Sequence, residues 1–151
     1  MSLLSIGLVL TYFNCIFAAC PPGWIAGTSS SSCYLFNQKS LNWLSASHFC
    51  RSEGAHLVRV DSVDEMNFIK NEIDLLPGQY WLDGVDDVVE GDWRWASTYS
   101  RIETKFWYPG EPNQNSRSEN CMETASRYHG LWNDEDCGNH QYSICEKETV
   151  Q

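Results

Sequence analysis

The polar segment 110–120 (Gly-Glu-Pro-Asn-Gln-Asn-Ser-Arg-Ser-Glu-Asn) is the part of the chain best equipped for chemistry. It carries two carboxylates, Glu111 and Glu119, and several side-chain amides. Carboxylate and amide oxygens are the ligands of Ca²⁺, a hard cation that takes six to eight of them. The competing interpretation is an ordinary polar connection on the surface.

Two carboxylates could also form the acid and base of a glycoside hydrolase, with Glu111 and Glu119 as the pair. An acid catalyst needs a raised pKa, whereas a calcium ion would keep both carboxylates ionised. No nucleophile and base triad is evident either. The residues therefore predict a binding protein and not an enzyme.

The charge of the chain supports a cation as partner. The 151 residues carry a net charge of −10, which makes nucleic acids and anionic membranes poor partners. Residues 20–151 have the length of one domain with one core.

Residues 1–19 have the order of a secretory signal peptide, an apolar stretch followed by small residues, with cleavage expected near Ala18 or Ala19. An uncleaved membrane anchor is the alternative, but Thr11, Tyr12 and Asn14 interrupt the apolar run. We therefore expect a soluble, secreted, extracellular product.

Six cysteines remain once Cys15 leaves with the signal peptide. An even number in a secreted chain predicts three disulfides, with fifteen pairings that spacing alone does not decide. Zinc binding is the weaker alternative, because the chain has no Cys-x-x-Cys motif. The six are Cys20, Cys33, Cys50, Cys121, Cys137 and Cys145.

Two helices and several short strands are predicted, in that order. Apolar residues at helical spacing run from Ser40 to a stop at Gly54, and a capping box of Ser62 and Glu65 begins a second helix that ends at residues 75–78. An extended segment, 56–60, separates them. Short β-favouring runs then follow at 80–85, 93–95, 121–124 and 142–145. This order predicts an α+β fold, with two helices packed on short antiparallel sheets.

Three motifs resemble those of the C-type lectin-like domain. Residues 80–84 resemble its W-I-G-L region, Glu111-Pro112-Asn113 its E-P-N motif, and Trp132-Asn133-Asp134 its W-N-D motif. The resemblance covers Cys20 to Lys147, and the cysteine order is similar to the long form of the domain. It implies a C-type lectin-like fold with a long calcium-binding loop region and the pairs Cys20–Cys33, Cys50–Cys145 and Cys121–Cys137.

The resemblance also implies a calcium site that binds sugar hydroxyls directly. A cis peptide bond before Pro112 is expected with it. A second calcium is implied at Asp86, Glu90 and Glu119, but Gln114 and Asn120 stand where acidic ligands are usual, so we expect that site to be weak or empty. The metal and carbohydrate ligands implied for the first site are Glu111, Asn113, Glu119, Asn133 and Asp134.

The implied function is that of a secreted calcium-dependent lectin for mannose, fucose or N-acetylglucosamine, sugars of the class with equatorial 3- and 4-hydroxyls. Such a lectin would serve innate immune recognition or agglutination of microbes. The alternative is a module that binds a protein, ice or mineral target, with calcium in a structural role. Because one open site binds weakly, useful avidity needs several domains, which a homodimer would supply.

The remaining candidates are expected to be structural or exposed. We expect nearly all of the tryptophans at 43, 81, 93, 95, 107 and 132 to lie in the core. Arg94, Arg101 and Arg117 are expected in solvent, with Arg117 near the sugar. Tyr128 and His129 are candidates for secondary contacts, whereas His48 and His140 are expected to be structural or exposed.

Overall fold

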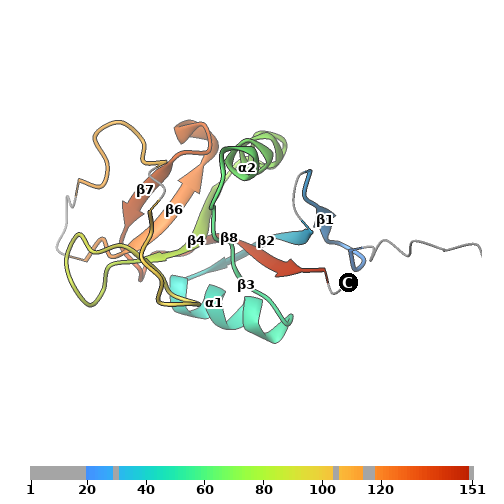
Figure 1. The fold of residues 1–151 in the computed structure, drawn as a ribbon, viewed down its shortest axis with the longest axis horizontal. Helices are drawn as coiled ribbons and strands as arrows, with labels where there is room; N and C mark the ends of the chain where they lie inside the picture. Colours follow the sequence, from blue (N-terminus) through green and yellow to red (C-terminus); the bar gives the residue numbers. More distant parts are fainter. Residues whose placement is uncertain (1–19, 29–30, 104–105, 114–117, 150–151) are drawn as a thin grey trace, which may run out of the picture.

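The computed structural model describes residues 20–28, 31–103, 106–113 and 118–149. The predicted signal peptide, Gln114 and Arg117 lie outside these ranges. No helix within them is long and apolar enough to cross a membrane. In chain order the elements are β1 (Ile25–Ala26), β2 (Ser32–Leu41), α1 (Trp43–Ser52), β3 (His56–Leu57), α2 (Val63–Leu75), β4 (Gln79–Val85), β5 (Arg94–Trp95), β6 (Cys121–Ala125), the 3₁₀ turn η1 (Ser126–Tyr128), β7 (Trp132–Glu135) and β8 (Gln141–Glu148) (Figure 1).

The described strands form one sheet in the order β1-β2-β8-β4-β6-β7, with β3 paired to β8 and β5 paired to β4. The predicted α+β fold with two helices is confirmed, but the sheet is mixed and not purely antiparallel. β4 and β8 run parallel, with Tyr80 opposite Tyr142 and Trp81 opposite Ser143. These strands are distant in the chain, and the side-chain alternation of a single strand carries no information on the direction of its partner.

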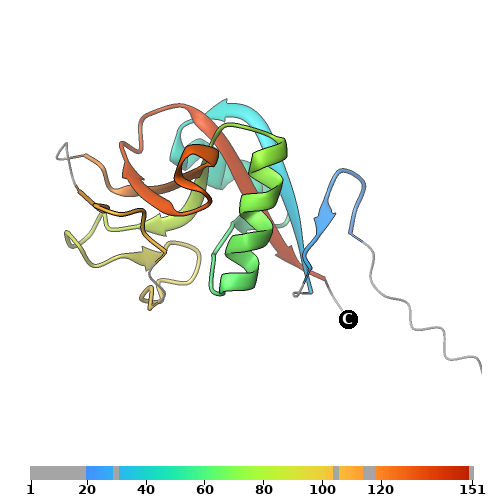
Figure 2. The same cartoon turned by 90° about the horizontal axis from the view of Figure 1, so that it is seen from above.

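The two helices lie on opposite sides of the central strands (Figures 1 and 2). Alternation along β4 explains this arrangement, because successive side chains point to opposite faces of a sheet. Tyr80 and Leu82 belong to the core that contains Ile69 of α2. Trp81 belongs to a second core, together with Cys50 of α1. The sheet is therefore apolar on both faces.

Helix α1 begins later than the sequence predicted. Ser40 and Leu41 belong to the ten-residue strand β2, which was not predicted from the sequence. Asn42 caps the helix, and its Oδ1 accepts a hydrogen bond from Ser45 N at 2.9 Å. The predicted glycine stop is confirmed, since Gly54 has a φ of +68°. The apolar pattern misplaced Leu44, which is 59% exposed.

Helix α2 begins at the predicted capping residue. Ser62 Oγ accepts from Glu65 N at 3.2 Å, as expected. The Glu65 carboxylate, however, accepts from Asp61 N at 2.9 Å and from the Tyr34 hydroxyl at 2.7 Å. The cap therefore ties the start of α2 to β2 as well as closing its own first turn.

The three disulfides join the pairs that the resemblance implied. Cys50–Cys145 connects α1 to β8 across 95 residues of chain, and Cys20–Cys33 and Cys121–Cys137 close loops of 13 and 16 residues. All six cysteines of the domain are therefore used.

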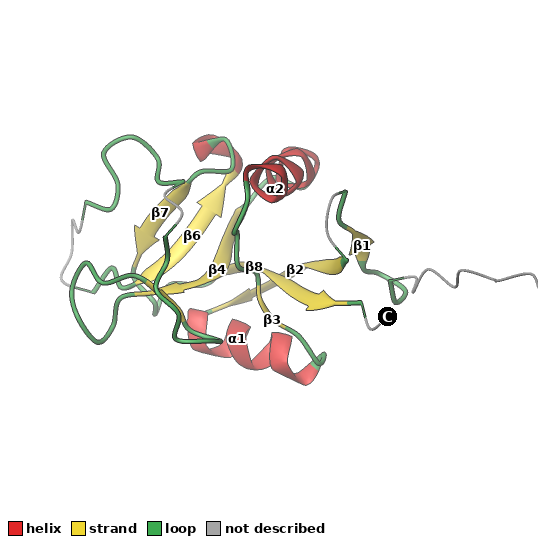
Figure 3. Cartoon of the chain, in the orientation of Figure 1, coloured by secondary structure: helices red, strands yellow, loops and turns green. Residues whose placement is uncertain are grey.

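Between β4 and β6, the described residues 86–103, 106–113 and 118–120 make up a long loop region with only the short strand β5. These loops gather at the end of the molecule opposite to β1 and the C-terminus (Figure 3). Four of the six tryptophans expected in the core are buried: Trp81, Trp93, Trp95 and Trp132. Trp43 and Trp107 are half-buried. Glu111, Asn113 and Glu119 of the predicted site lie in this loop region, whereas Asn133 and Asp134 lie in β7.

Candidate calcium and sugar site

Aromatic packing holds the two halves of the site side by side. The backbone of the segment 106–108 pairs with Trp132: Trp132 N donates to Phe106 O at 2.7 Å, and Tyr108 N donates to Trp132 O at 2.8 Å. The rings of Phe106 and Trp107 pack edge-on against the fully buried Trp132 ring, with centroids 5.3 and 5.6 Å away. Since the polar residues follow both segments directly, this pairing sets residues 111–113 against the middle of β7.

Glu111, Asn113 and Asp134 converge at this point. The Asn113 backbone N–H donates to Asp134 Oδ1 at 3.2 Å, and the Asn113 side-chain amide donates to Glu111 Oε2. The Glu111 backbone is held in turn by a 2.9 Å hydrogen bond to Tyr108 O. The expected cis bond between Glu111 and Pro112 is present. Three of the five predicted ligands are thus in mutual contact.

The electrostatics of this cluster suit a cation. Partial burial raises the pKa of Glu111, and the neighbouring Asp134 carboxyl raises the same pKa further, while the amide of Asn113 opposes both effects. Two acidic groups that repel each other's charge form a place where a positive ion would be stabilised. The donors are hard oxygens, which fits calcium.

Asn133 contacts a residue that the sequence analysis missed, Glu123 of β6. The Asn133 side-chain Nδ2 donates to Glu123 Oε1 at 2.9 Å, and the two residues are direct cross-strand neighbours. Glu123 is fully buried, and this burial raises its pKa to about 7. A glutamate between Met122 and Thr124 in a strand of buried residues was the available signal, because a buried carboxylate requires partners.

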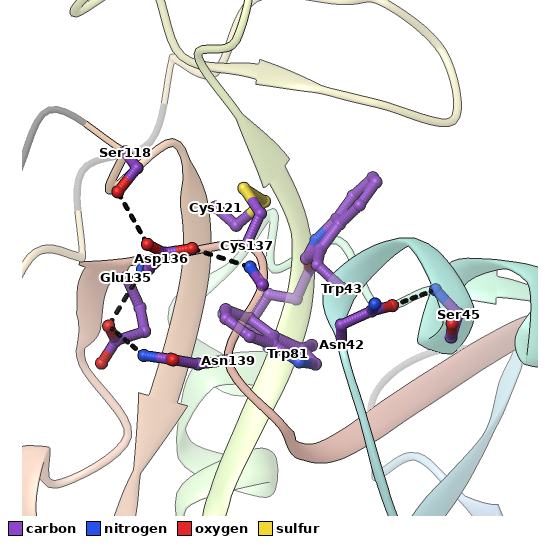
Figure 4. Close-up of a disulfide and its surroundings, with 12 residues drawn as sticks. Asn42, Trp43, Ser45, Trp81, Ser118, Cys121, Glu135, Asp136, Cys137 and Asn139 are labelled. Atoms are coloured by element: carbon purple, nitrogen blue, oxygen red, sulfur yellow. Dashed lines mark hydrogen bonds between the residues drawn. A yellow bond between two sulfur atoms is a disulfide. The ribbon is translucent and has the colours of Figure 1, made fainter.

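Glu119 lies in the loop that leads into β6, and it is partly buried. The start of β6 is fixed beside the end of β7 by the Cys121–Cys137 disulfide and by a 2.7 Å hydrogen bond from Ser118 Oγ to Asp136 Oδ2 (Figure 4). This bond and the Gly138 N–H lower the pKa of Asp136. The anchor places the Glu119 segment near β7, and its role as a ligand stays a prediction.

The residues predicted for a second calcium are partly assembled. Asp86, at the end of β4, is 4% exposed; its Oδ2 accepts from Gly91 N at 2.9 Å, whereas its Oδ1 is buried without a hydrogen-bond partner. Burial is the main cause that raises the pKa of Asp86 to about 6, with the carboxyls of Glu90 and Asp134 contributing to the rise and the Gly91 N–H opposing it. Asp86 and Glu90 therefore lie together, close to Asp134. Occupancy of this second site stays a prediction.

Within the described ranges, no group of three or more His, Cys, Asp or Glu side chains is arranged to hold a metal ion. The described cysteines are all in disulfides, which removes the zinc alternative for them. The candidate site instead combines the Glu111 and Asp134 carboxylates with the Asn113 and Asn133 amides. Such mixed carboxylate and amide sets are ordinary for calcium.

The model of the lectin C-type domain matches residues 39–147 of this chain. The chain belongs to the C-type lectin domain family. Over 135 residues it is 36% identical to human C-type lectin domain family 17, member A, covering 89% of this chain and 34% of the relative. It is 33% identical to the galactose-specific lectin nattectin of Thalassophryne nattereri, covering 86% of this chain and 81% of that lectin. The chain thus spans about a third of the first of these relatives.

Solved structures agree with the fold. The C-type lectin carbohydrate-recognition domain of the mouse scavenger receptor superposes with a TM-score of 0.79 at 29% identity, covering 87% of this chain and all of that one. An SPL-1 complex with GlcNAc has a TM-score of 0.77 at 32% identity, covering 90% and 100%. A calcium-independent type II antifreeze protein has a TM-score of 0.76 at 28% identity, covering 87% and 96%. The C-type lectin domain is a binding module, not an enzyme.

Further features of the lectin domain surround the cluster. A cavity of about 630 Å³ adjoins Glu111 and Pro112 and is lined by Trp93, Trp107 and Arg101 among others. Arg94 and Arg101 were expected in solvent, and their side chains are 42% and 67% exposed. Both also pair with Asp92, at 2.7 and 3.1 Å.

Tyr128 lies near the site, as expected. Its ring packs against Tyr108 at 5.1 Å, and the Arg127 guanidinium lies 4.7 Å from the ring centroid. His129, which follows, is exposed with a φ of +55°. His48 and His140 are exposed, in line with the expectation. Tyr128 is therefore the better candidate for a secondary contact.

Proposed function

We propose that this chain is a calcium-dependent lectin domain in which one Ca²⁺ is held by Glu111, Asn113, Glu119, Asn133 and Asp134. The observation that carries the proposal is the convergence of Glu111, Asn113 and Asp134, which come from the long loop region and from β7. The Asn113 N–H to Asp134 hydrogen bond of 3.2 Å joins the two segments directly. The negative charge and the hard oxygen donors of this cluster support calcium over other metals.

Each side chain has a definite task in holding the sugar. Calcium, when bound, supplies open coordination positions for two neighbouring hydroxyls. The Glu111 carboxylate only accepts, so it takes the hydrogen of a hydroxyl. The amide groups of Asn113 and Asn133 each carry two hydrogens, so either can donate to a hydroxyl while it still donates to Glu111 or Glu123. The carboxylate acceptor and the amide donors thus match two neighbouring hydroxyls of a sugar, with Glu111 accepting from a hydroxyl and Asn113 or Asn133 donating to one.

We further propose that this order favours mannose, fucose or N-acetylglucosamine, as in the E-P-N subclass, and that the domain is of the long form. The Glu111-Pro112-Asn113 sequence supports it, as does the likeness to a structure solved with GlcNAc. A relative that is 33% identical is named a galactose-specific lectin, so family membership alone does not decide the sugar. Competition by mannose and by galactose does.

The alternative function is a C-type lectin-like module that binds a protein, ice or mineral target. The likeness to a calcium-independent antifreeze protein supports keeping it. In that case calcium would be dispensable or structural, and the Glu111 cluster would not bind sugar. Affinity for mannose that is the same in calcium and in chelator, or absent from both, would favour this alternative.

We propose that the protein is secreted, with residues 1–19 as signal peptide, and that it recognises glycans of microbes or of glycoproteins. The three disulfides are typical of extracellular domains. A homodimer would supply the avidity that a single open site lacks. Sedimentation of the purified protein tests the dimer, and N-terminal sequencing of the secreted product tests the cleavage.

The experiment that tests the proposal is titration of the purified protein with methyl mannoside by calorimetry, first in calcium and then in chelator. Binding in calcium alone is expected. The variant expected to lose binding is Glu111→Gln, which keeps the size of the side chain but removes one charge from the calcium site. Mannoside binding by Glu111→Gln at the affinity of the unmodified protein would contradict the assignment.

A further inference from the structure

Glu123 contacts the proposed ligand Asn133 although it is not itself one of the proposed ligands. Its side chain is fully buried in β6, the strand between β4 and β7. In the sheet register Glu123 is opposite Trp81 of β4 on one side and Asn133 of β7 on the other. Glu123 therefore connects the proposed calcium ligand Asn133 of β7 to β4, near the centre of the sheet.

The carboxylate collects donors from several elements. Asn133 Nδ2 donates to Oε1 at 2.9 Å, and Gln79 Nε2 of β4 donates to Oε2 at 3.2 Å. The Arg127 guanidinium of η1 lies 3.6 Å from Oε1, and the Gln141 side chain of β8 also interacts with the carboxyl. A buried carboxylate with this many partners has one favoured position, because moving it would leave several polar groups unpaired.

The chemistry of this contact decides which way the Asn133 amide faces. Both Glu123 oxygens act as acceptors, Oε1 toward Asn133 Nδ2 and Oε2 toward Gln79 Nε2, so Asn133 presents its NH₂ group to Glu123. The amide oxygen lies on the other side of the same planar group and is directed away from Glu123. Calcium requires that oxygen, since an NH₂ group cannot ligate it. Without Glu123, rotation of the amide by half a turn would place the wrong atom toward the metal.

We propose that Glu123 is a positioning residue, which holds Asn133 in the orientation that turns Oδ1 toward the bound calcium ion. The inference rests on the proposed function, because it assumes that Asn133 is a ligand. Glu123 touches neither metal nor sugar in this arrangement. It acts through Asn133, in the manner of the second-layer partners that orient metal ligands in other proteins.

The test compares two isosteric substitutions of buried carboxylates, Glu123→Gln and Glu146→Gln. Glu146 is 7% exposed, near the C-terminal end of β8, and accepts from Ser32 Oγ at 2.8 Å and Arg59 N at 3.3 Å. Strand β8 ends near the C-terminus, at the end of the molecule away from the long loop region (Figure 1). Both variants lose an acceptor, but only Glu123→Gln replaces the group that dictates the Asn133 orientation.

Calcium affinity is measured by calorimetry without sugar, and thermal unfolding is measured in chelator. We expect Glu123→Gln to weaken calcium binding by about 10- to 100-fold, the usual effect of removing such a partner. Glu146→Gln should change calcium affinity by less than about twofold while lowering the unfolding temperature in chelator. Equal calcium affinities of Glu123→Gln and the unmodified protein would overturn the positioning role and leave the proposed function intact. No calcium binding by the unmodified protein up to about 10 mM, beyond the range of weak extracellular sites, would overturn both.

A measurement on the unmodified protein covers the case in which Glu123→Gln does not fold. The Asn133 side-chain amide is followed by ¹⁵N NMR in chelator. Two separate Nδ2 proton signals, one of them slow to exchange with solvent, are expected before calcium is added. A rapidly exchanging Asn133 amide in chelator would show that its orientation is not set in advance, and it would overturn the inference.

Discussion

The substitution Asn113→Asp separates sugar binding from metal binding at the proposed site. It replaces an NH₂ donor by an oxygen of nearly the same size, in a side chain that is exposed. The Asn113 side-chain amide donates to Glu111, and its backbone N–H, which the substitution retains, donates to Asp134 at 3.2 Å. The variant therefore keeps an oxygen for the metal but cannot donate to a sugar hydroxyl.

The size of the effect follows from what is lost and what is gained. Loss of a donor to a bound hydroxyl costs about 1–3 kcal/mol, which is about a 5- to 150-fold loss of mannose affinity. The new charge lies beside Glu111 and Asp134, and two charges about 4 Å apart in water repel by about 1 kcal/mol. We therefore expect slightly lower stability in chelator and calcium affinity that is equal or higher, since calcium relieves this repulsion.

The assay is retention on a mannose column in calcium, with calorimetry for calcium alone. Asn67→Asp is the matched control, because it adds the same charge at an exposed position of α2. We expect Asn67→Asp to be retained like the unmodified protein and Asn113→Asp to elute early while still binding calcium. Unchanged retention of Asn113→Asp, or loss of calcium and mannose together, would refute the proposed geometry.

Four other predictions concern the pH dependence of stability, the pH dependence of mannose retention, the disulfides and the sugar. Burial raises the pKa of Asp83 from 3.8 to about 6, so the stability that protonated Asp83 contributes, about 3 kcal/mol, is complete below pH 3.8 and is lost as the pH rises through 6. The unfolding temperature in chelator should therefore rise when the pH is lowered from 7.5 to 5, and it should rise less steeply for Asp83→Asn. A fall in the unfolding temperature over this range would contradict the sign. Mannose retention should weaken over the same range, because the calcium ligands must lose their protons; flat affinity would count against carboxylate ligands. Replacing Cys50 and Cys145 by serine should lower the free energy of unfolding by about 5 kcal/mol, because this pair closes a long loop. The same change at Cys20 and Cys33, which close a shorter loop, should lower it by about 3 kcal/mol. Denaturant titration measures both losses, and equal losses would argue against the loop-length explanation. Free mannose should elute the protein from the column and galactose should not, and equal elution by both would defeat the specificity proposed from Glu111 and Asn113.

Local signals in the sequence predicted much of the fold. The capping residue Ser62 and the glycine stop at Gly54 act within a few residues of chain, so the start of α2 and the end of α1 could be placed. Strand β2 was missed because its burial depends on β8, to which it pairs more than a hundred residues away. The parallel direction of β4 and β8 was missed for the same reason.

The site shows the same division between local and distant causes. Glu111 and Asn113 were proposed as ligands because their oxygens suit calcium and because they match the E-P-N motif of the resemblance, and the structure brings them to Asp134 through the pairing of residues 106–108 with Trp132. Glu123 was not found, because its importance comes from a cross-strand partner that only the register of β6 and β7 reveals. The sequence thus indicated the proposed ligand residues of the cluster, but not Glu123, which contacts one of them.

The most direct test of the central claim is a glycan array probed with the purified protein in calcium and again in chelator. A calcium-dependent lectin of the proposed specificity should bind glycans that end in mannose, fucose or N-acetylglucosamine in calcium, and should release them in chelator. Binding that persists in chelator, or a preference for terminal galactose in calcium, would contradict the proposal.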